Sequence, residues 1–532
     1  MATASDTQHV GKRDTSVWAN IRFIWFTILV GFSLLEYGFD NGEIGGFQAM
    51  VGFLQVFGYE DPRVPTGWNI RPVPQQIISS FMLLGSFIAS CCTGLIGTYL
   101  GRRHSLMSGC ALLIVGVTIQ IVTTSMGALY FARLITGLSN GILMSFTFLY
   151  VVEMAPPYFR GLGYAFCSCW VTLGTAIGYV ITNSTEKIHN RHAYQIPLYT
   201  LYAIPVIIFS SLPFLPESPR WLLLHGKTEQ ALQSLSWIRN GAYDDLALRQ
   251  EYEEMKLNAM HEIETQSSFL LFDMLRSRNI RRSLISVGIG LINPAMGGMF
   301  VMAFATYFFT VVGVESPFRW IIMCQFLGVL GQVTSYFFID RVGRRTMLLI
   351  GTSICAISML LLGVVSTPSS VRYSEAYGKV VIFLFSFYLW GFNFGVTSMT
   401  YLVAGEIPAQ NLRAYTSGIS TGSGFVFAWL TAFTAPYFIN PSELNWGGKY
   451  GYIWFGTCVV AIIFVFLFVP EVRGRTLEEI EEMFDKKISA RDFSTYVCDN
   501  VIIAREQAEE VVYGEKKPER VEVVHVEAAD SA

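Results

Sequence analysis

Long apolar runs alternate with short polar segments along most of the 532-residue chain. A helix needs about 20 mostly apolar residues to cross the hydrocarbon core of a bilayer. Runs of this kind occupy residues 22–48, 76–98, 105–125, 128–152, 162–183, 197–215, 283–311, 318–339, 346–366, 379–403, 414–438 and 450–470. The pattern therefore predicts an all-α membrane protein with twelve transmembrane helices.

The apolar runs fall into two groups of six, and a charged segment separates the groups. The predicted organisation is a cytoplasmic N-terminal tail, a six-helix bundle, a cytoplasmic amphipathic helical linker, a second six-helix bundle and a cytoplasmic tail, over residues 1–20, 21–215, 216–282, 283–470 and 471–532. Within the linker we expect short amphipathic helices from Glu229 to Arg239 and from Asp244 to His261, lying on a membrane face.

Composition agrees with a polytopic membrane protein. Only 14% of the residues are charged, against about 25% in an average soluble domain. The net charge of −3 gives no reason to expect a nucleic-acid partner. The nine cysteines mostly lie in apolar runs and lack metal-ligand spacing, so we expect no metal and no other cofactor. The first twenty residues are polar, so we expect no cleaved signal peptide, and the first membrane helix should direct targeting.

Basic residues in the short loops predict the orientation, because Lys and Arg accumulate on the cytoplasmic side of a membrane. With both termini in the cytoplasm, that side collects Arg102, Arg103, Arg160, Arg341, Arg344, Arg345, Arg413, Arg473 and Arg475. The sequon Asn183-Ser184-Thr185 then falls on the opposite side, where Asn183 is a predicted glycosylation site.

The two groups of spans repeat one another. Each carries a Gly-Arg-Arg triplet after its second span and a Glu-x6-Arg spacing after its fourth, at Gly101–Arg103, Gly343–Arg345, Glu153–Arg160 and Glu406–Arg413. Arginines that only enforce topology would explain the basic residues but not the paired glutamates. Two related six-helix halves are what an alternating-access transporter requires, because its substrate site lies between bundles that rock about it.

Four motifs resemble signatures of one family. Residues 216–222 read PESPRWL, residues 470–480 read PEVRGRTLEEI, residues 340–345 read DRVGRR, and residues 38–40 read GFD. They resemble PESPRWL, PETKGxTLEEI, DRxGRR and GYD of the sugar porters in the major facilitator superfamily, over about residues 20 to 487. The resemblance is greatest to fungal sugar and α-glucoside-like transporters, and it implies two pseudo-symmetric six-helix bundles.

The same resemblance implies a cytoplasmic gate of arginines and carboxylates. In the family such contacts hold the cytoplasmic side shut in the outward-facing state. The matching positions here are Arg102, Arg103, Glu153, Arg160, Glu217, Asp340, Arg341, Arg345, Glu406, Arg413 and Glu471. Thr98 and Tyr99 stand where the family has Asp-Arg, so we expect weaker closure in the first half.

Charged residues inside the membrane are candidates for function, because burying them is costly. Glu36, Asp40 and Glu43 share one face of the first span, and Arg133 lies in the fourth. By resemblance, Asp40 and Arg133 match the proton site of proton-coupled sugar porters; the alternative is a permanent structural ion pair. Glu36 and Glu43 are further proton sites, contacts for a polar or cationic substrate group, or residues facing water.

The family's hexose-binding amides are largely missing. Ser168 stands at the span-five glutamine, residues 294–300 at QQxxGxN of span seven, Tyr401 at the span-ten tryptophan, and Gly424 and Phe425 at the Gln-Trp pair of span eleven. The predicted substrate-binding residues are Ser168, Phe300, Tyr307, Asn393, Tyr401, Phe425 and Trp429. We therefore do not expect free glucose to be preferred; an oligosaccharide, a polyol, a quinate-like acid or a less polar metabolite stays open.

The sequence predicts a secondary active transporter of a sugar or sugar-like small molecule, with proton symport, working as a monomer in the plasma membrane. A facilitator or exporter of a non-sugar metabolite is the first alternative, and a transporter-like nutrient sensor is the second. No residue pattern resembles a catalytic site, so we do not expect an enzyme. The direction of transport is not written in the sequence, because alternating access is reversible.

Overall fold

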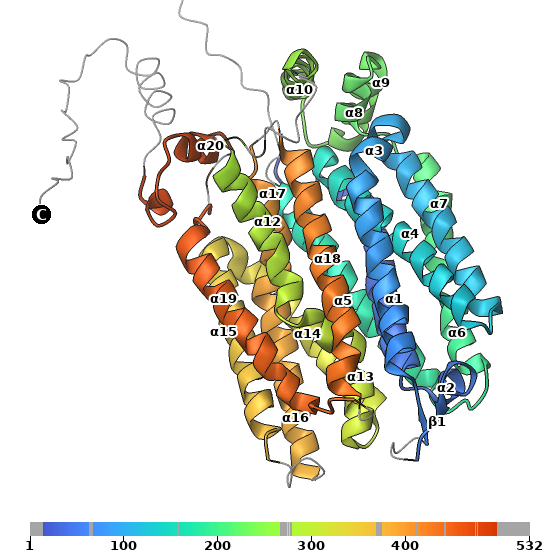
Figure 1. The fold of residues 1–532 in the computed structure, drawn as a ribbon. Coiled ribbons are helices and arrows are strands. Elements are labelled where there is room, and N and C mark those ends of the chain that lie inside the picture. Colours follow the sequence, from blue (N-terminus) through green and yellow to red (C-terminus); the bar gives the residue numbers. More distant parts are fainter. Residues whose placement is uncertain are drawn as a thin grey trace, which may run out of the picture.

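The computed structural model describes residues 14–496, except 17, 63–66, 157–158, 266–273, 275, 277–278, 369–374, 410–411, 441–442, 474 and 476. Almost all of these residues lie in helices that run side by side (Figure 1). Of the cytoplasmic tail predicted over residues 471–532, the structure describes the part up to residue 496. Cys498 lies outside the described residues.

Helices α1 to α7 form the first half of the bundle. Their bounds are α1 Ile21–Phe47, α2 Val51–Phe57, α3 Pro72–Val122, α4 Met126–Met154, α5 Arg160–Thr185, α6 His192–Leu201 and α7 Ala203–Ser211, with a short 3-10 turn η2 at Leu212–Phe214. The strands β1 (Tyr59–Glu60) and β2 (Trp68–Asn69) pair antiparallel between α2 and α3.

The second half follows a charged linker. The linker helices are α8 Pro219–Leu224, α9 Thr228–Arg239 and α10 Asp245–Thr265. The second half contains α12 Ile280–Ala295, α13 Gly298–Val312, α14 Pro317–Val342, α15 Arg344–Val365, α16 Glu375–Gly391, the π-helix η3 Phe392–Thr397, α17 Ser398–Glu406, α18 Arg413–Ile439, η5 Gly447–Tyr450 and α19 Gly451–Phe468. Helix α20 (Leu477–Asp485) and the turn η6 (Asp492–Ser494) follow.

The described helices provide twelve membrane crossings, because one long helix crosses twice. The described residues contain 11 apolar helical segments of sufficient length, and α3 alone has 51 residues. A helix of that length measures about 77 Å, more than twice a hydrocarbon core of about 30 Å. Its backbone leaves the helical region at Gly101, where φ is 77°, so α3 crosses twice. The prediction of an all-α fold with twelve spans is confirmed.

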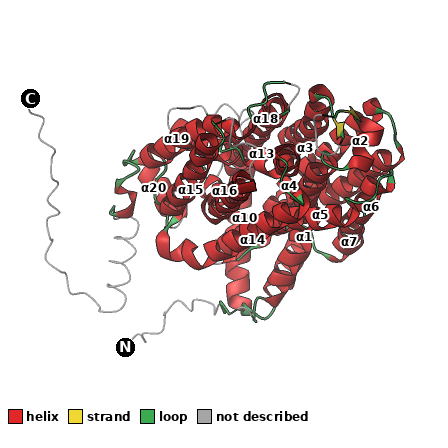
Figure 2. Cartoon of the chain, turned by 90° about the horizontal axis from the view of Figure 1, so that it is seen from below, coloured by secondary structure: helices red, strands yellow, loops and turns green. Residues whose placement is uncertain are grey.

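The two ends of the bundle differ. Helices α8, α9, α10 and α20 cap one end, which we call the linker end, and α2 and β1 lie at the other, the sheet end (Figure 1). Seen along the bundle in Figure 2, α15, α16 and α19 lie to one side and α5, α6 and α7 to the other. The linker end is the one that the distribution of arginines predicts to be cytoplasmic.

Charged contacts attach the capping helices to the spans. Arg239 of α9 donates to the carbonyl of Met154 at 2.7 Å, at the end of α4, and pairs with Glu251 of α10 at 2.9 Å. In the second half, Arg282 of α12 lies 3.1 Å from Asp485 of α20. Each half therefore carries its own cap at the linker end.

Two spans are broken in mid-membrane. Span seven divides into α12 and α13 at Gly297, whose φ of 87° favours glycine, and Pro294 precedes the break. Span ten contains the π-helix η3 between α16 and α17. Breaks of this kind often mark functional sites in membrane helices, because they free backbone groups and provide hinges.

Glycines let the helices of the first half approach closely. A Cβ atom at Gly137 of α4 would lie 2.1 Å from the Met82 carbonyl oxygen of α3, and one at Gly174 of α5 would lie 2.1 Å from the Leu35 carbonyl oxygen of α1. Small residues at such contacts are typical of membrane helices, whose association depends on close van der Waals contact.

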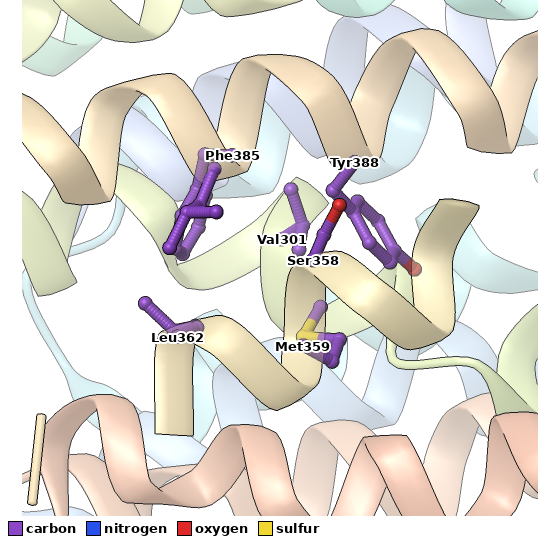
Figure 3. A pocket seen from close by; sticks show the side chains of 7 residues that line it. Val301, Ser358, Met359, Leu362, Phe385 and Tyr388 are labelled. Carbon is purple, nitrogen blue, oxygen red and sulfur yellow. The ribbon is translucent and has the colours of Figure 1, made fainter. Parts of the chain in front are cut away.

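The interior of the second half is filled by apolar side chains. Val301 of α13, Met359 and Leu362 of α15, and Phe385 and Tyr388 of α16 converge there (Figure 3). The space between them leaves no room for a water molecule. A substrate path through this part of the half is therefore excluded in this conformation.

The glycine contacts lead to a stability prediction. Gly137→Ala should lower the thermal unfolding midpoint of the detergent-purified protein, because the added methyl group meets α3 backbone; overpacking of this kind costs about 1–3 kcal/mol. Gly456→Ala on α19 is the matched control, since no atom lies within 4 Å of the added carbon. Equal midpoints for the two variants would show that the close approach of α3 and α4 is not required.

Candidate functional site

A buried ion pair joins α1 and α4. Nη1 of Arg133 lies 2.6 Å from Oδ1 of Asp40, and the two side chains are 1% and 2% exposed. Two further donors of Arg133 contact α3, at the Ile78 carbonyl (3.2 Å) and the Met82 sulfur (3.2 Å). The other carboxylate oxygen of Asp40 is buried and has no hydrogen-bond partner among the described residues. The two predicted members of the proton site are thus in direct contact.

Two more carboxylates lie beside this pair. Glu36 faces Asn140 of α4, whose amide donates to Oε1 at 3.1 Å when its nitrogen is turned toward the carboxylate, as hydrogen bonding requires. Glu43 is fully buried, and neither of its oxygens has a hydrogen-bond partner among the described residues. One guanidinium neutralises only one of three carboxylates, so proton binding at the others removes uncompensated charge from the membrane.

Backbone and carboxylate groups meet at the linker end of the first half. The backbone N–H groups of Arg102 and Arg103 donate to the two oxygens of Glu217, at 3.0 and 3.1 Å. The guanidinium of Arg102 binds Glu153 through two hydrogen bonds of 2.9 and 2.7 Å. Gly101 precedes these residues with φ 77°, and a Cβ there would lie 2.7 Å from Glu217, which explains the glycine.

The second half repeats this arrangement. The backbone N–H groups of Arg344 and Arg345 donate to Glu471 at 2.9 and 3.1 Å. Arg344 pairs with Glu406 at 3.8 Å, in the place of the Arg102–Glu153 pair. Gly343 has a φ of 99° and lies against Glu471. The repeat read from the sequence therefore corresponds to a repeated structural unit.

The predicted gate residues divide into three groups. Arg102, Arg103, Glu153, Glu217, Arg345, Glu406 and Glu471 take part in the two units just described. Arg341 is exposed, and its backbone carbonyl accepts a hydrogen bond from Arg473. The side chains of Arg160, Asp340 and Arg413 lie outside the described residues.

The described arginine–glutamate pairs of the predicted gate lie within the halves. Each described arginine–glutamate pair joins elements of the same half, so these pairs brace the halves internally. The pair of the first half is 2.7 Å long and that of the second half 3.8 Å long. Because both pairs lie within a half, weaker closure of the first half stays a prediction. Arg344 was missed as a gate residue, and its place in the Gly-Arg-Arg repeat could have identified it.

The halves contact each other through neutral hydrogen bonds along α5. Tyr336 of α14 donates to the Ala165 carbonyl at 2.6 Å, and Gln332 of α14 donates to Ser168 at 2.9 Å. Thr172 donates to Asn393 of η3 at 3.1 Å. Positions 165, 168 and 172 share one face of α5. These contacts, which we call the α5 seam, bring the predicted residues Ser168 and Asn393 to the boundary of the halves.

Aromatic contacts continue this boundary. Tyr401 stacks on Phe148 with ring centres 5.3 Å apart, and Phe425 meets Tyr37 edge to face at 6.2 Å. Both pairs join one residue of each half.

Toward the sheet end, the hydroxyl of Tyr307 donates to Asn69 at 3.1 Å, and Asn440 donates to the Ile70 carbonyl at 3.1 Å. The halves thus touch from the linker side of the α5 seam to the sheet end.

Two predicted substrate residues, Phe300 and Trp429, contact other aromatic residues of the second half. Phe300 is fully buried among Phe308, Phe385 and Tyr450, inside the second half rather than at the boundary. A role in direct substrate contact does not fit that position in this conformation. Trp429 is half-buried and stacks on Phe433, and its indole N–H is buried without a hydrogen-bond partner among the described residues.

Sequence reasoning missed the amides of α14. Gln325, Gly328 and Gln332 share one face of that helix, and the amide nitrogen of Asn393 lies 2.9 Å from where a Cβ of Gly328 would be. Nε2 of Gln325, Oε1 of Gln332 and the hydroxyl of Thr397 are buried without partners among the described residues. Glutamines in an apolar span were the available signal, since polar side chains in membrane helices usually face other helices.

Two other predicted features can be placed. Asn183 lies in the last turn of α5, and the Oδ1 atom of its side-chain amide is buried, so its glycosylation stays a prediction. Among the described residues, no group of three or more His, Cys, Asp or Glu could hold a metal ion.

Comparison with known proteins places these features in context. Residues 26–484 match the family model described as "Sugar (and other) transporter". The Major facilitator-type transporter ecdD of Aspergillus rugulosus is 28% identical over 87% of this chain and 87% of its own length. The Probable glucose transporter rco-3 of Neurospora crassa is 27% identical over 89% of this chain and 81% of its own.

Solved structures of the xylose transporter XylE share the fold. The proton:xylose symporter XylE bound to 6-bromo-6-deoxy-D-glucose aligns with a TM-score of 0.72 at 21% identity, over 87% of this chain and 100% of that one. XylE from E. coli in a partially occluded inward-open conformation aligns with a TM-score of 0.69 at 20% identity, over 86% and 100%.

The buried ion pair leads to a double-mutant prediction. Asp40→Asn should lower the free energy of unfolding in detergent by about 3–5 kcal/mol, because it leaves the Arg133 guanidinium buried without its counter-ion. Adding Arg133→Gln should recover part of this loss, so the two changes are not additive. Glu36→Gln, which can still accept from Asn140, is the control and should change stability little. Strict additivity would contradict a direct, desolvated pair.

Proposed function

Since the chain belongs to the "Sugar (and other) transporter" family, we propose that it moves a sugar or sugar-like small molecule across the membrane by alternating access, with proton symport. Proton symport is supported by the buried Asp40–Arg133 ion pair, which is 2.6 Å long and shielded from water. Recognition of a sugar-like substrate is supported by the α5 seam, where polar groups of both halves meet.

Proton coupling follows from the strain that helix movement places on the pair. While Arg133 touches Asp40, the carboxylate is stable as an anion. If substrate binding or a local movement of α1 within the first half separates Asp40 from Arg133, Asp40 becomes a buried charge without a partner, and protonation removes that charge. Protonation of Asp40 and separation from Arg133 thereby favour one another, which is the coupling that a symporter needs.

A permanent structural pair is the alternative, and the contacts of Asp40 bear on it. A purely structural carboxylate is expected to have both oxygens satisfied. Here Oδ2 of Asp40 is buried and unpaired among the described residues, and the unpaired carboxylate of Glu43 lies one turn away on the same helix. This partly satisfied arrangement fits a group that exchanges a proton better than one that only holds two helices together.

Substrate recognition is assigned to the α5 seam and its neighbours. Gln325, Gln332, Asn393 and Thr397 offer amide and hydroxyl groups, which suit sugar hydroxyls because each can donate or accept. Tyr401 and Phe425 lie at the same boundary between the halves, and aromatic faces stack on the apolar side of a pyranose. The amides expected on spans five, seven and eleven are thus replaced by amides on α14 and η3.

The kind of contact between the halves supports alternating access. Contacts between the halves run along α5 and on to the sheet end through the Tyr307–Asn69 bond. They are hydrogen bonds and ring contacts, which can break and form again at low cost compared with buried ion pairs. The paired charges stay within each half, so each half moves as a braced unit. We place this cycle in the plasma membrane, with the linker end in the cytoplasm.

Transport and its coupling can be tested together. Uptake of labelled xylose, glucose, maltose and mannitol would be measured in cells that lack their own sugar transport, at several external pH values. We expect accumulation of at least one of these compounds, faster at lower external pH, because the proton enters with the substrate. Asp40→Asn should abolish accumulation but keep exchange of substrate across the membrane, which needs no net proton movement.

The remaining outcomes separate the alternatives. Accumulation that persists in Asp40→Asn would show that coupling does not use Asp40 and would refute the proposed proton site. Uptake that only equilibrates the compound and ignores external pH would identify a facilitator and refute symport. If correctly localised protein takes up none of the four compounds, the sugar assignment is refuted, and acids and export of other metabolites become the candidates. Glu36→Gln serves as the control for loss of a buried carboxylate that does not touch Arg133.

The α14 amides give a second prediction. Gln332→Leu should raise the KM for the transported compound on the order of fivefold, the effect of losing about one neutral hydrogen bond, with a smaller change in maximal rate. Gln120→Leu is the matched control, because Gln120 is a buried amide of the first half whose hydrogen-bond partner among the described residues is Thr136. The same KM change in both variants would refute a substrate role for Gln332.

A further inference from the structure

A groove opens between α14 and α16 on the outside of the second half. Its volume is about 400 Å³, and it is lined by Trp320, Met323, Leu327, Lys379, Ile382, Phe383, Ser386, Phe387 and Trp390. This volume lies within the range of ligand sites, about 300–1,000 Å³. The groove is separate from the α5 seam, which uses the opposite side of α14.

The groove is built from two helical stripes. Trp320, Met323 and Leu327 recur at i, i+3 and i+7 on α14, which places them on one face. On α16 the stripe runs from Lys379 through Phe383 and Phe387 to Trp390. Side chains of both stripes are partly exposed, with Met323 at 39% and Phe383 at 66%. Since both helices span the membrane, this open side faces the bilayer.

The groove closes at its deep end. A Cβ at Gly331 of α14 would lie 2.4 Å from the Trp390 carbonyl oxygen, so the two helices touch there. Along the floor, the Cys324 sulfur lies 3.2 Å from the Ser386 hydroxyl. Toward the sheet end, the two helices are farther apart, and Trp320 and Phe383 line the space between them. The groove is therefore a blind slot that opens to one leaflet.

The length of the slot matches one leaflet. Lys379 and Trp390 are eleven residues apart, or about 16 Å along the helix axis, roughly half of the hydrocarbon thickness of about 30 Å. Lys379 lies one turn from the start of α16 at the sheet end and is exposed. A lysine at that depth extends its ammonium group toward the headgroups, while its stem covers apolar surface.

A lipid acyl chain fills such a slot better than water does. Seven of the nine lining side chains are aliphatic or aromatic, and the only others are Ser386 and Lys379. A water molecule needs two to four polar partners, which most of this surface does not offer. An acyl chain restores the dispersion contacts that an empty slot would lose, and a phosphate group at the rim complements the charge of Lys379.

We propose that the α14–α16 groove is a phospholipid site, which takes one acyl chain along its length and the headgroup phosphate at Lys379. The bound chain supports α14 from the membrane side. The other side of that helix carries Gln332 and Tyr336 of the α5 seam. The site is independent of which compound the protein transports.

Quenching of tryptophan fluorescence tests the site directly, because Trp320 and Trp390 line it. The full-length protein in detergent would be titrated with phosphatidylcholine carrying brominated acyl chains. We expect saturable quenching that is lost in the variant Trp320→Phe/Trp390→Phe. Lys379→Gln should weaken the apparent affinity by up to about fivefold, the upper range for one exposed ion pair with the headgroup phosphate. Lys449→Gln, a lysine of the sheet end outside the groove, should leave the affinity unchanged.

Three results would overturn the proposal. Quenching that does not saturate, or that survives loss of Trp320 and Trp390, would show only bulk lipid around the protein. An unchanged affinity in Leu327→Phe, which adds volume inside the groove, would show that the lipid binds elsewhere. Quenching by a brominated sterol in place of the brominated phospholipid would assign the groove to sterol. Far-ultraviolet circular dichroism of each variant separates loss of binding from loss of folding.

Discussion

A carboxylate and a guanidinium in the hydrocarbon region of a membrane are stable only if they neutralise each other. Asp40 and Arg133 meet this condition at 2.6 Å. The pair fixes α1 against α4, and its remaining donors fix α4 against α3. The close approach of Gly137 to Met82 in the same region keeps these helices at the distance that the pair requires. Much of the first half can be understood as the surroundings of this one contact.

The same electrostatic condition organises the linker end, where water lowers the cost of charge. There, Glu217 and Glu471 each accept from two backbone N–H groups at the start of a helix, and a glycine with positive φ makes room for each carboxylate. Such hydrogen bonds also place a negative charge at the positive end of the helix dipole. Because both halves use this unit, each can rotate without breaking the charge pairs at its linker end.

The fold was predictable from the sequence, because spans of about 20 apolar residues are imposed by the thickness of the bilayer. The ion pair was also predictable, since Asp40 and Arg133 are costly at membrane depth wherever they lie. The residues at the boundary between the halves were less predictable. Phe300 looked like a cavity residue because its motif matched, but packing inside the second half is decided by contacts with Phe385 and Tyr450 that no local pattern encodes.

Gln332 shows the complementary difficulty. It lies in a span whose family motif gave no reason to single it out, and only the packing of α14 against α5 shows that it reaches Ser168. A long-range contact of this kind depends on the angle and register between two helices, which short sequence patterns do not determine. Polar residues in apolar spans are better guides to an interface than motif positions, because the membrane offers them no other partner.

Helix α14 combines these constraints. One face carries Gln325, Gln332 and Tyr336 toward the other half, and another carries Trp320, Met323 and Leu327 toward the lipid. A helix with both faces in use cannot rotate about its own axis without exposing amides to lipid, which costs several kcal/mol per unsatisfied group. Its movement during transport is therefore restricted to tilting with the whole second half. The hydrogen bonds of the α5 seam can break during such a tilt, whereas the polar faces within each half stay covered.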